Sequence, residues 1–164
     1  MKKALSLAIA MVLACVFTIP VLATNANGGD TLITYNVASS YVVIIPPSIT
    51  VSSGTGADEY GVASGSLIEA GKKLVFTITE ATNYDTVNNK FRMINSADST
   101  IYLGYSIKDE ANNDVVMNTP FLNVLSSEAN AGKKIRLTYS TDNATVAGTY
   151  TDMVTITVAM ANAN

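Results

Sequence analysis

Short stretches in which apolar and polar residues alternate constrain the fold of this chain more than any other feature of its sequence. The clearest are residues 72–80 and 133–140, in which every second residue is apolar. The apolar residues of these two stretches are Leu74, Phe76, Ile78, Ile135, Leu137 and Tyr139. A two-residue period is that of a strand with one buried face, and no window shows the longer period of a core helix.

The remaining strands are predicted from shorter alternations and from β-branched runs between turn residues. They are expected at 31–38, 41–51, 91–96, 100–108, 115–117 and 147–160. Within 41–51, Pro46-Pro47 are expected to mark an edge, a bend or a change of sheet, because proline cannot donate to a ladder. Residues 120–125 fit a strand or a short helix, and the Gly- and Ser-rich segment 52–71 is expected to be a long connection, with a short strand at most at Leu67-Ile68. Such strands predict an all-β fold, an antiparallel, immunoglobulin-like β-sandwich of about 7–9 strands.

Residues 1–23 have the composition of a secretory signal peptide. Lys2 and Lys3 precede an apolar run that ends in small residues at Ala23, where we expect cleavage, with Ala26 as the alternative site. Residues 24–30 then form a flexible leader, residues 31–160 a single β-sandwich domain, and residues 161–164 a short polar tail. The predicted location is therefore extracellular, either secreted or at the cell surface.

Two membrane attachments through this N-terminal segment are alternatives to free secretion. An uncleaved apolar run would be about long enough to span a bilayer. Cys15 ends the sequence Val12-Leu13-Ala14-Cys15, which loosely resembles the box at which bacterial lipoproteins are acylated. Leu13 is bulky for such a box, however, and the residues after Cys15 stay apolar. We therefore expect Cys15 to be an ordinary signal-peptide residue.

Several residue types that carry most enzyme chemistry are missing. The chain has no His and no Trp, and its one cysteine is Cys15. Imidazole acid–base catalysis, Ser-His-Asp and Cys-His nucleophiles, and nearly every zinc, iron or copper site are thereby excluded. No Ser-X-X-Lys sequence occurs, and no pair of carboxylates is marked out for glycoside hydrolysis. We therefore expect a protein that is not an enzyme and uses no cofactor.

The charge of the mature chain argues against two classes of partner. Loss of Lys2 and Lys3 leaves 8 of the 10 basic residues beside 13 acidic ones, a net charge of −5. No basic stripe is present. Neither nucleic acid nor an anionic membrane surface is therefore an expected partner.

A weak candidate for a calcium site lies at residues 109–114. Asp109, Glu110 and Asp114 combine here with two asparagines, and oxygen ligands suit Ca²⁺. The spacing of a calcium-binding loop is absent, however, and runs of Asn and Asp also make tight turns. A turn is the favoured interpretation, and no metal is expected.

The tyrosines offer a second kind of candidate site. Exposed tyrosines can bind polysaccharide or build an interface, whereas a tyrosine at a strand end packs its ring on the core and leaves its hydroxyl in water. Packing is the favoured interpretation for most of them. They are Tyr35, Tyr41, Tyr60, Tyr84, Tyr102, Tyr105, Tyr139 and Tyr150.

One short sequence occurs twice. "EAGKKLVFT" at 69–77 and "NAGKKIRLT" at 130–138 share Ala-Gly-Lys-Lys followed by an alternating strand. Convergence on one kind of strand start, guarded by lysines, is the favoured interpretation. A duplicated half-domain, or two equivalent strands in facing sheets, is the alternative.

Two segments resemble those of known surface proteins. "TYNVASSYVVIIPPSITV" at 34–51 resembles the first strands of small secreted Firmicutes cell-surface β-sandwich proteins, and "AGTYTDMVTITVAM" at 147–160 resembles their closing strand. The second segment is also similar to the end of spore coat protein U-type domains, which include pilus subunits built by strand complementation. The Trp-X-Leu signature of the WxL-type surface proteins and the cysteines of the coat protein domains are absent. The resemblance therefore implies an immunoglobulin-like sandwich at a Gram-positive cell surface.

The first and last strands carry the functional hypothesis. A terminal strand on a flexible leader can pair with a neighbouring molecule, and repeated pairing makes a filament. The apolar residues of this predicted assembly strand are Ile33, Tyr35, Val37, Val43 and Ile45. The closing strand is expected to pair on both sides and to cover the core. Its apolar residues are Tyr150, Val154, Ile156 and Val158.

We therefore expect a secreted, non-enzymatic structural protein of the cell surface or extracellular matrix. Its specific form would be a self-assembling, pilin-like subunit that exchanges strands with a second copy of itself. The alternative is an adhesion module that binds cell-wall polysaccharide or a host glycan.

Overall fold

The computed structural model describes residues 33–51 and 54–164. The predicted signal peptide, with Cys15, and the leader 24–30 lie outside the described residues, as do residues 31 and 32 of the predicted domain. One compact unit comprises Ala38–Asn164, and residues 33–37 are not part of it. Within the described ranges, the helical segment is neither long nor apolar enough to cross a membrane.

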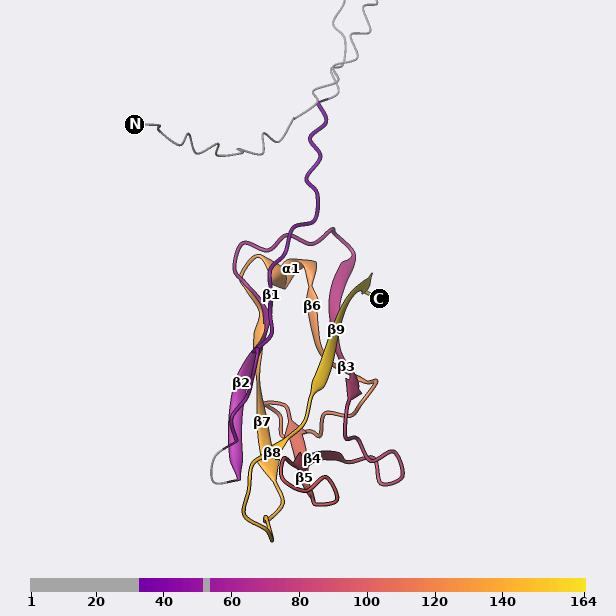
Figure 1. Cartoon of the computed structure of the whole chain (residues 1–164). Coiled ribbons are helices and arrows are strands. Elements are labelled where there is room, and N and C mark those ends of the chain that lie inside the picture. The colour runs from indigo at the N-terminus through magenta and orange to yellow at the C-terminus, as the bar shows by residue number, and fades with distance from the viewer. Residues whose placement is uncertain (1–32, 52–53) are drawn as a thin grey trace, which may run out of the picture. The chain divides into compact units, whose positions relative to one another are not determined.

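Nine strands of the described residues form two antiparallel sheets (Figure 1). The larger sheet has the order β1-β2-β7-β5-β4-β8 and the smaller one β6-β3-β9. The strands of the larger sheet are β1 (Val43–Ile44), β2 (Thr55–Val62), β7 (Lys134–Thr141), β5 (Tyr102–Lys108), β4 (Phe91–Asn95) and β8 (Tyr150–Thr151). Those of the smaller sheet are β6 (Pro120–Leu125), β3 (Lys72–Ala81) and β9 (Val154–Asn162). A single helical turn, α1 (Ser126–Ala129), follows β6.

The two sheets enclose the core, as the alternation of their strands predicts. Leu74, Phe76 and Ile78 of β3 are at most 1% exposed, and Leu137 and Tyr139 of β7 are buried in the facing sheet. Buried side chains of both sheets join in two apolar clusters. The prediction of an all-β, antiparallel sandwich is therefore confirmed, and nine strands agree with the predicted number.

Four predicted strands, now β3, β4, β5 and β7, are found near their expected positions. Residues 120–125 form a strand, which is the first of the two alternatives for this region, and the helical turn α1 follows at Ser126–Ala129. Residues 115–117, expected as the second strand of a hairpin, form no strand. Val115 is nevertheless buried, and its backbone N–H donates to the carbonyl oxygen of Ile107 at 2.8 Å.

β2 lies inside the segment 52–71, for which the sequence predicts a long connection, and that prediction is wrong. The glycines of this segment indicated a loop, but two of them stand where a neighbouring backbone comes close. A Cβ atom at Gly56 would lie 2.9 Å from the carbonyl oxygen of Thr50, and one at Gly61 would collide with the carbonyl oxygen of Lys133. The strand therefore needs glycine at these points for packing.

β1 is shorter than the buried strand expected at 42–45, whereas the edge or bend expected at Pro46-Pro47 is found. It contains only Val43–Ile44, at the edge of the larger sheet, and both residues are only partly buried. Pro46 and Pro47 give the physical reason, because proline has no backbone N–H to donate to a ladder, and the chain bends at Pro47.

The closing strand is divided between the two sheets, which the sequence analysis did not predict. Its apolar residues are Tyr150 in β8 and Val154, Ile156 and Val158 in β9. The chain crosses from the larger to the smaller sheet at residues 152–153. Among the described residues β9 has one partner, β3, rather than the two expected. It runs on to Asn162, so two residues of the predicted tail 161–164 belong to the strand.

The first predicted strand, 31–38, is not formed by its described residues, which belong to no strand. Ile33, Tyr35 and Val37 are 87%, 77% and 58% exposed. A short strand was suggested at Leu67-Ile68. In the structure Leu67 makes only an isolated antiparallel bridge, to Ser40. The alternation at 33–37 is therefore present without a sheet partner that would bury its apolar face.

The repeated Ala-Gly-Lys-Lys sequence begins one long strand in each sheet. Gly71 and Gly132 have φ values of 77° and 80°, which glycine adopts without the steric cost that a Cβ imposes. β3 follows the first glycine and β7 the second. The two copies of the sequence therefore begin strands of different sheets, which both interpretations of the repeat allow.

Candidate functional site

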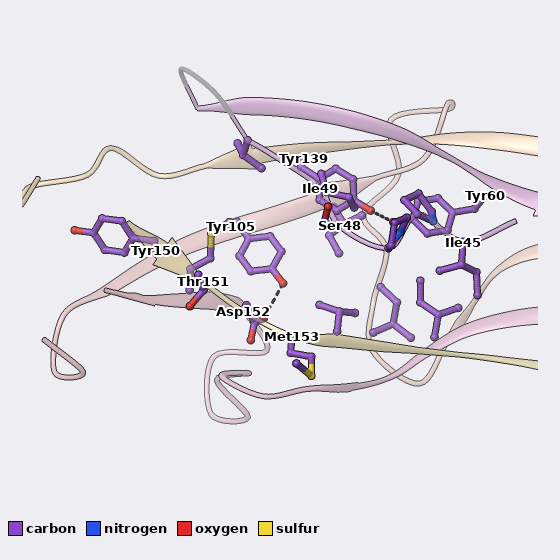
Figure 2. A pocket seen from close by; sticks show the side chains of 18 residues that line it. Ile45, Ser48, Ile49, Tyr60, Tyr105, Tyr139, Tyr150, Thr151, Asp152 and Met153 are labelled. Atoms are coloured by element: carbon purple, nitrogen blue, oxygen red, sulfur yellow. Dashed lines mark hydrogen bonds between the residues drawn. The ribbon is translucent and has the colours of Figure 1, made fainter. Parts of the chain in front are cut away.

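A cavity of about 420 Å³ opens between the bend that follows β1 and the chain that passes from β8 to β9. We call this cavity the seam, and its borders are residues of the segments 45–51 and 150–156 (Figure 2). Its floor consists of core residues from both sheets, namely Tyr60, Ile78, Tyr105, Ile107 and Tyr139. The apolar core is therefore reached through the seam.

The tandem prolines keep the chain's own first strand from closing the seam. Residues 45–51 contribute the apolar side chains of Ile45 and Ile49 to the border, but they form no strand. Pro46 and Pro47 cannot donate backbone hydrogen bonds to a neighbouring strand. This border of the seam is therefore packed against the cavity without pairing to β9.

β9 is less well covered than the other strands of its sheet. Its inward side chains Val154, Ile156 and Val158 are only partly buried. On the opposite side of β3, by contrast, Leu122 and Val124 of β6 are 4% and 0% exposed. β6 lies against β2, which closes that side of the sandwich. The incomplete side of the sandwich is therefore the one along β9.

β9 lacks the residues that usually protect a strand edge, although its pairing with β3 has a register shift between Ile78 and Glu80 of β3. Its described pairing is to β3 alone, and residues 153–164 contain neither a charged residue nor a proline. Natural edge strands commonly carry lysine, proline or a strong bulge, which discourages pairing with another chain. A nine-residue edge without such residues is suited to the addition of a strand.

Three buried tyrosines place polar atoms on the floor of the seam. The hydroxyls of Tyr60 and Tyr139 share a hydrogen bond of 2.6 Å, and the Tyr105 hydroxyl donates to Asp152 at 2.8 Å (Figure 2). Burial raises the pKa of all three tyrosines above the ordinary value. The hydrogen bonds to Asp152 and to Tyr60 raise the pKa of Tyr105 and of Tyr139 further. The three hydroxyls are therefore neutral at physiological pH.

Asp152 fixes the joint at which the chain changes sheets. Besides the Tyr105 hydroxyl, its carboxylate accepts hydrogen bonds from the backbone and the side-chain nitrogen of Asn83, both at 3.1 Å. In the sequence Asp152 was visible only as an interruption of the apolar series. Its role depends on partners 47 and 69 positions away, which no local pattern reveals.

The structure does not assemble the predicted calcium candidate. The Asp109 carboxylate accepts two backbone N–H groups of its own turn. Glu110 accepts the backbone N–H of Arg136 at 2.8 Å, and Asp114 pairs with Lys108 at 3.1 Å. No group of three ligating side chains occurs in the part of the chain that the structure describes. The three carboxylates therefore serve separate contacts.

Several tyrosines follow the packing interpretation. Tyr60, Tyr105 and Tyr139 are buried and cannot meet a sugar ring. Tyr102 is 50% exposed, but the Arg92 guanidinium lies over its ring at 4.6 Å from the centroid. One face of that ring is therefore already occupied by a cation–π contact.

The residues of the predicted assembly strand fall into two groups. Val43 pairs with Val62 inside the compact unit, and Ile45, 39% exposed, borders the seam. Both therefore belong to their own domain. Residues 33–37 form the second group, exposed and outside that unit.

Comparisons with known proteins do not place the chain in a family. No protein-family model and no curated protein matches the sequence. One similar solved structure is described as "Chaperone-tip adhesin complex is vital for synergistic activation of CFA/I fimbriae biogenesis". Its sequence identity is 15% and its TM-score 0.47, and the match covers 75% of this chain and 42% of that chain. A likeness at this level carries no argument about function.

Proposed function

We propose that this protein is a secreted structural subunit of the cell surface or extracellular matrix, and that its copies join by strand addition. The strand that one copy adds to another is the segment 33–37. The observation that carries the proposal is that this segment alternates, is exposed, and has no strand partner among the described residues.

The alternation of the segment matches what an added strand needs. Ile33, Tyr35 and Val37 stand at odd-numbered positions of the segment, and Thr34 and Asn36 stand at even-numbered ones. An extended chain places residues of one parity on one face, so pairing would bury three apolar side chains and leave two polar ones outside. Burial of a large apolar side chain is worth about 1.5–3 kcal/mol, and backbone hydrogen bonds add to the affinity.

The proposal includes a structural rather than a catalytic role. The polar groups of the seam, three tyrosine hydroxyls and the Asp152 carboxylate, are bound to one another or to Asn83. The chain has no His that could supply acid–base chemistry near neutral pH. A glycan-binding module is less well supported, because burial removes three of the tyrosines that would stack on a sugar ring.

The test compares the size of the exported protein with that of two single variants. The full chain is expressed with its predicted signal peptide, purified from the medium, and measured by light scattering and negative-stain microscopy. Tyr35→Asp places a charge on the apolar face of the segment, and the matched control Asn36→Asp places the same charge on the polar face.

The proposal predicts oligomers or filaments for the wild type and for Asn36→Asp. For Tyr35→Asp it predicts monomers whose urea unfolding is unchanged, because Tyr35 lies outside the compact unit. A wild type that stays monomeric at every concentration contradicts it.

A further inference from the structure

We propose that the acceptor for residues 33–37 is the seam of a second copy, where the segment pairs with the free edge of β9. The inference rests on the proposed function, since it names the site at which the added strand binds.

The strand edges of the two sheets differ in their ability to accept a strand. β1 and β8, at the ends of the larger sheet, contain two residues each and offer little backbone for pairing. β6, at one end of the smaller sheet, already has its inward side chains buried. β9, at the other end, combines nine residues, one described partner and partly buried inward side chains. Only β9 therefore gains both backbone hydrogen bonds and apolar burial from another strand.

The apolar faces of donor and acceptor match in number and spacing. Residues 33–37 span about 17 Å when extended, because a strand rises about 3.4 Å per residue. The first five residues of β9, Val154–Val158, span the same length and have three inward apolar residues. The donor also has three, of which Tyr35 is the central one. Tyr35 would then lie opposite the middle of this stretch, at Ile156.

The electrostatics of the seam suit an uncharged donor. Residues 33–37 and β9 contain no charged side chain. Asp152 borders the seam, but its carboxylate already accepts three hydrogen bonds, from Tyr105 and Asn83. Docking would therefore bury no unpaired charge, and the assembly should change little with salt, since screening acts on exposed charges.

A second copy is the occupant that the structure favours over the chain's own neighbouring segment. Residues 45–51 already border the seam, and Pro46 and Pro47 keep them from pairing with β9. The segment that has the required alternation lies outside the compact unit and is exposed. The same chain thus has both a segment that can be added as a strand and a strand edge that can accept one. Copies with both features can assemble head to tail.

The test is a parity experiment with cysteine pairs in the full chain, in a Cys15→Ser background. Donor variants have one cysteine at position 33, 34, 35, 36 or 37, and acceptor variants have Ile156→Cys or Thr157→Cys. Thr157 is exposed on the outer face of β9, so this acceptor serves as the matched control of opposite parity. A donor and an acceptor are mixed, oxidised and analysed for disulfide-linked dimers on a non-reducing gel.

The inference predicts that Ile156→Cys captures the odd donors, with position 35 favoured, and that Thr157→Cys captures the even ones. We expect about a tenfold preference, because neighbouring strand residues point to opposite faces and only same-face residues come within about 5 Å across a strand pair. Urea unfolding of Ile156→Cys checks that the acceptor is folded, and Thr157→Cys gives an independent reading from an exposed position.

Three results would overturn the inference, and they differ in what they imply for the proposed function. If Tyr35→Asp abolishes assembly but no parity preference appears, the added strand binds elsewhere and the proposed function stands. If a chain that has both cysteines forms an internal disulfide while the mixtures give no dimer, the segment folds back on its own domain. If the wild type does not assemble at all, both proposals fail.

Discussion

Replacement of Asp152 by alanine tests the joint at which the chain crosses between the sheets. The Asp152 carboxylate accepts hydrogen bonds from the Tyr105 hydroxyl at 2.8 Å and from two nitrogens of Asn83 at 3.1 Å. Tyr105 is 7% exposed, so its hydroxyl would lose its partner at a largely buried position. The variant therefore removes the side-chain contacts of the junction between β8 and β9, while the pairing of β8 with β4 and of β9 with β3 remains.

The expected loss can be estimated from these contacts. A hydrogen bond to a charged group contributes about 1.5–3 kcal/mol, and a buried donor left without a partner costs about 1–3 kcal/mol. Because Asp152 is itself only partly buried, we take the lower ends of these ranges and expect a loss of about 2.5 kcal/mol in the free energy of unfolding. With a urea m-value of about 2 kcal/mol/M, the midpoint should fall by about 1.2 M.

The assay is urea unfolding followed by tyrosine fluorescence and circular dichroism, with two controls. Asp152→Asn keeps a side-chain oxygen that can accept the same hydrogen bonds, so it should lose less stability than Asp152→Ala. Asp142→Ala removes an exposed carboxylate whose ion pair with Lys90 is 4.0 Å long, and it should change stability by at most about 0.5 kcal/mol. A midpoint for Asp152→Ala equal to that of Asp142→Ala would refute the role given to Asp152.

Three further predictions concern the core and its tyrosines. The free energy of unfolding should change little between about pH 7 and pH 10. Above about pH 10 it should fall by about 1.4 kcal/mol per pH unit for each tyrosine that stays protonated in the fold, because an unfolded tyrosine ionises near pH 10 while burial raises the pKa of Tyr60, Tyr105 and Tyr139. Urea midpoints between pH 8 and 11 measure this, and a constant midpoint would contradict it. Gly61→Ala should lower the free energy of unfolding by about 3 kcal/mol, because the new methyl group meets the Lys133 carbonyl oxygen. A thermal midpoint within a degree of wild type would show that β2 tolerates a Cβ at this position. Phe76→Ala should lower the free energy of unfolding by about 3–5 kcal/mol. Val87→Ala, at a site that is 86% exposed, should lower it by less than about 0.5 kcal/mol. Equal losses of stability in urea unfolding would be inconsistent with the assigned core.

The strands that could be predicted from the sequence are those in which apolar and polar residues alternate along the whole strand. Leu74, Phe76 and Ile78 of β3 are such a case, because their burial follows from spacing alone. β2 could not be predicted in the same way. Gly56 and Gly61 look like loop residues until the neighbouring carbonyl oxygens that exclude a Cβ are known, and those oxygens belong to other segments.

The same distinction applies to the candidate site. The donor segment was visible in the sequence, because its alternating apolar residues and its position before the domain are local features. The acceptor was not visible, because the number of partners that β9 has depends on the order of strands in the sheet. The division of the closing strand at Asp152 was missed for a related reason, since its partners Tyr105 and Asn83 are distant in sequence.

Hydrogen exchange of the exported wild-type protein, measured by mass spectrometry over a range of concentrations, tests the central claim most directly. Strand addition between copies predicts that residues 33–37 and 154–158 exchange rapidly in dilute protein and become protected together as the concentration rises, while β3 stays protected throughout. Segments that exchange rapidly at every concentration, or a segment 33–37 that is protected independently of concentration, would contradict the account.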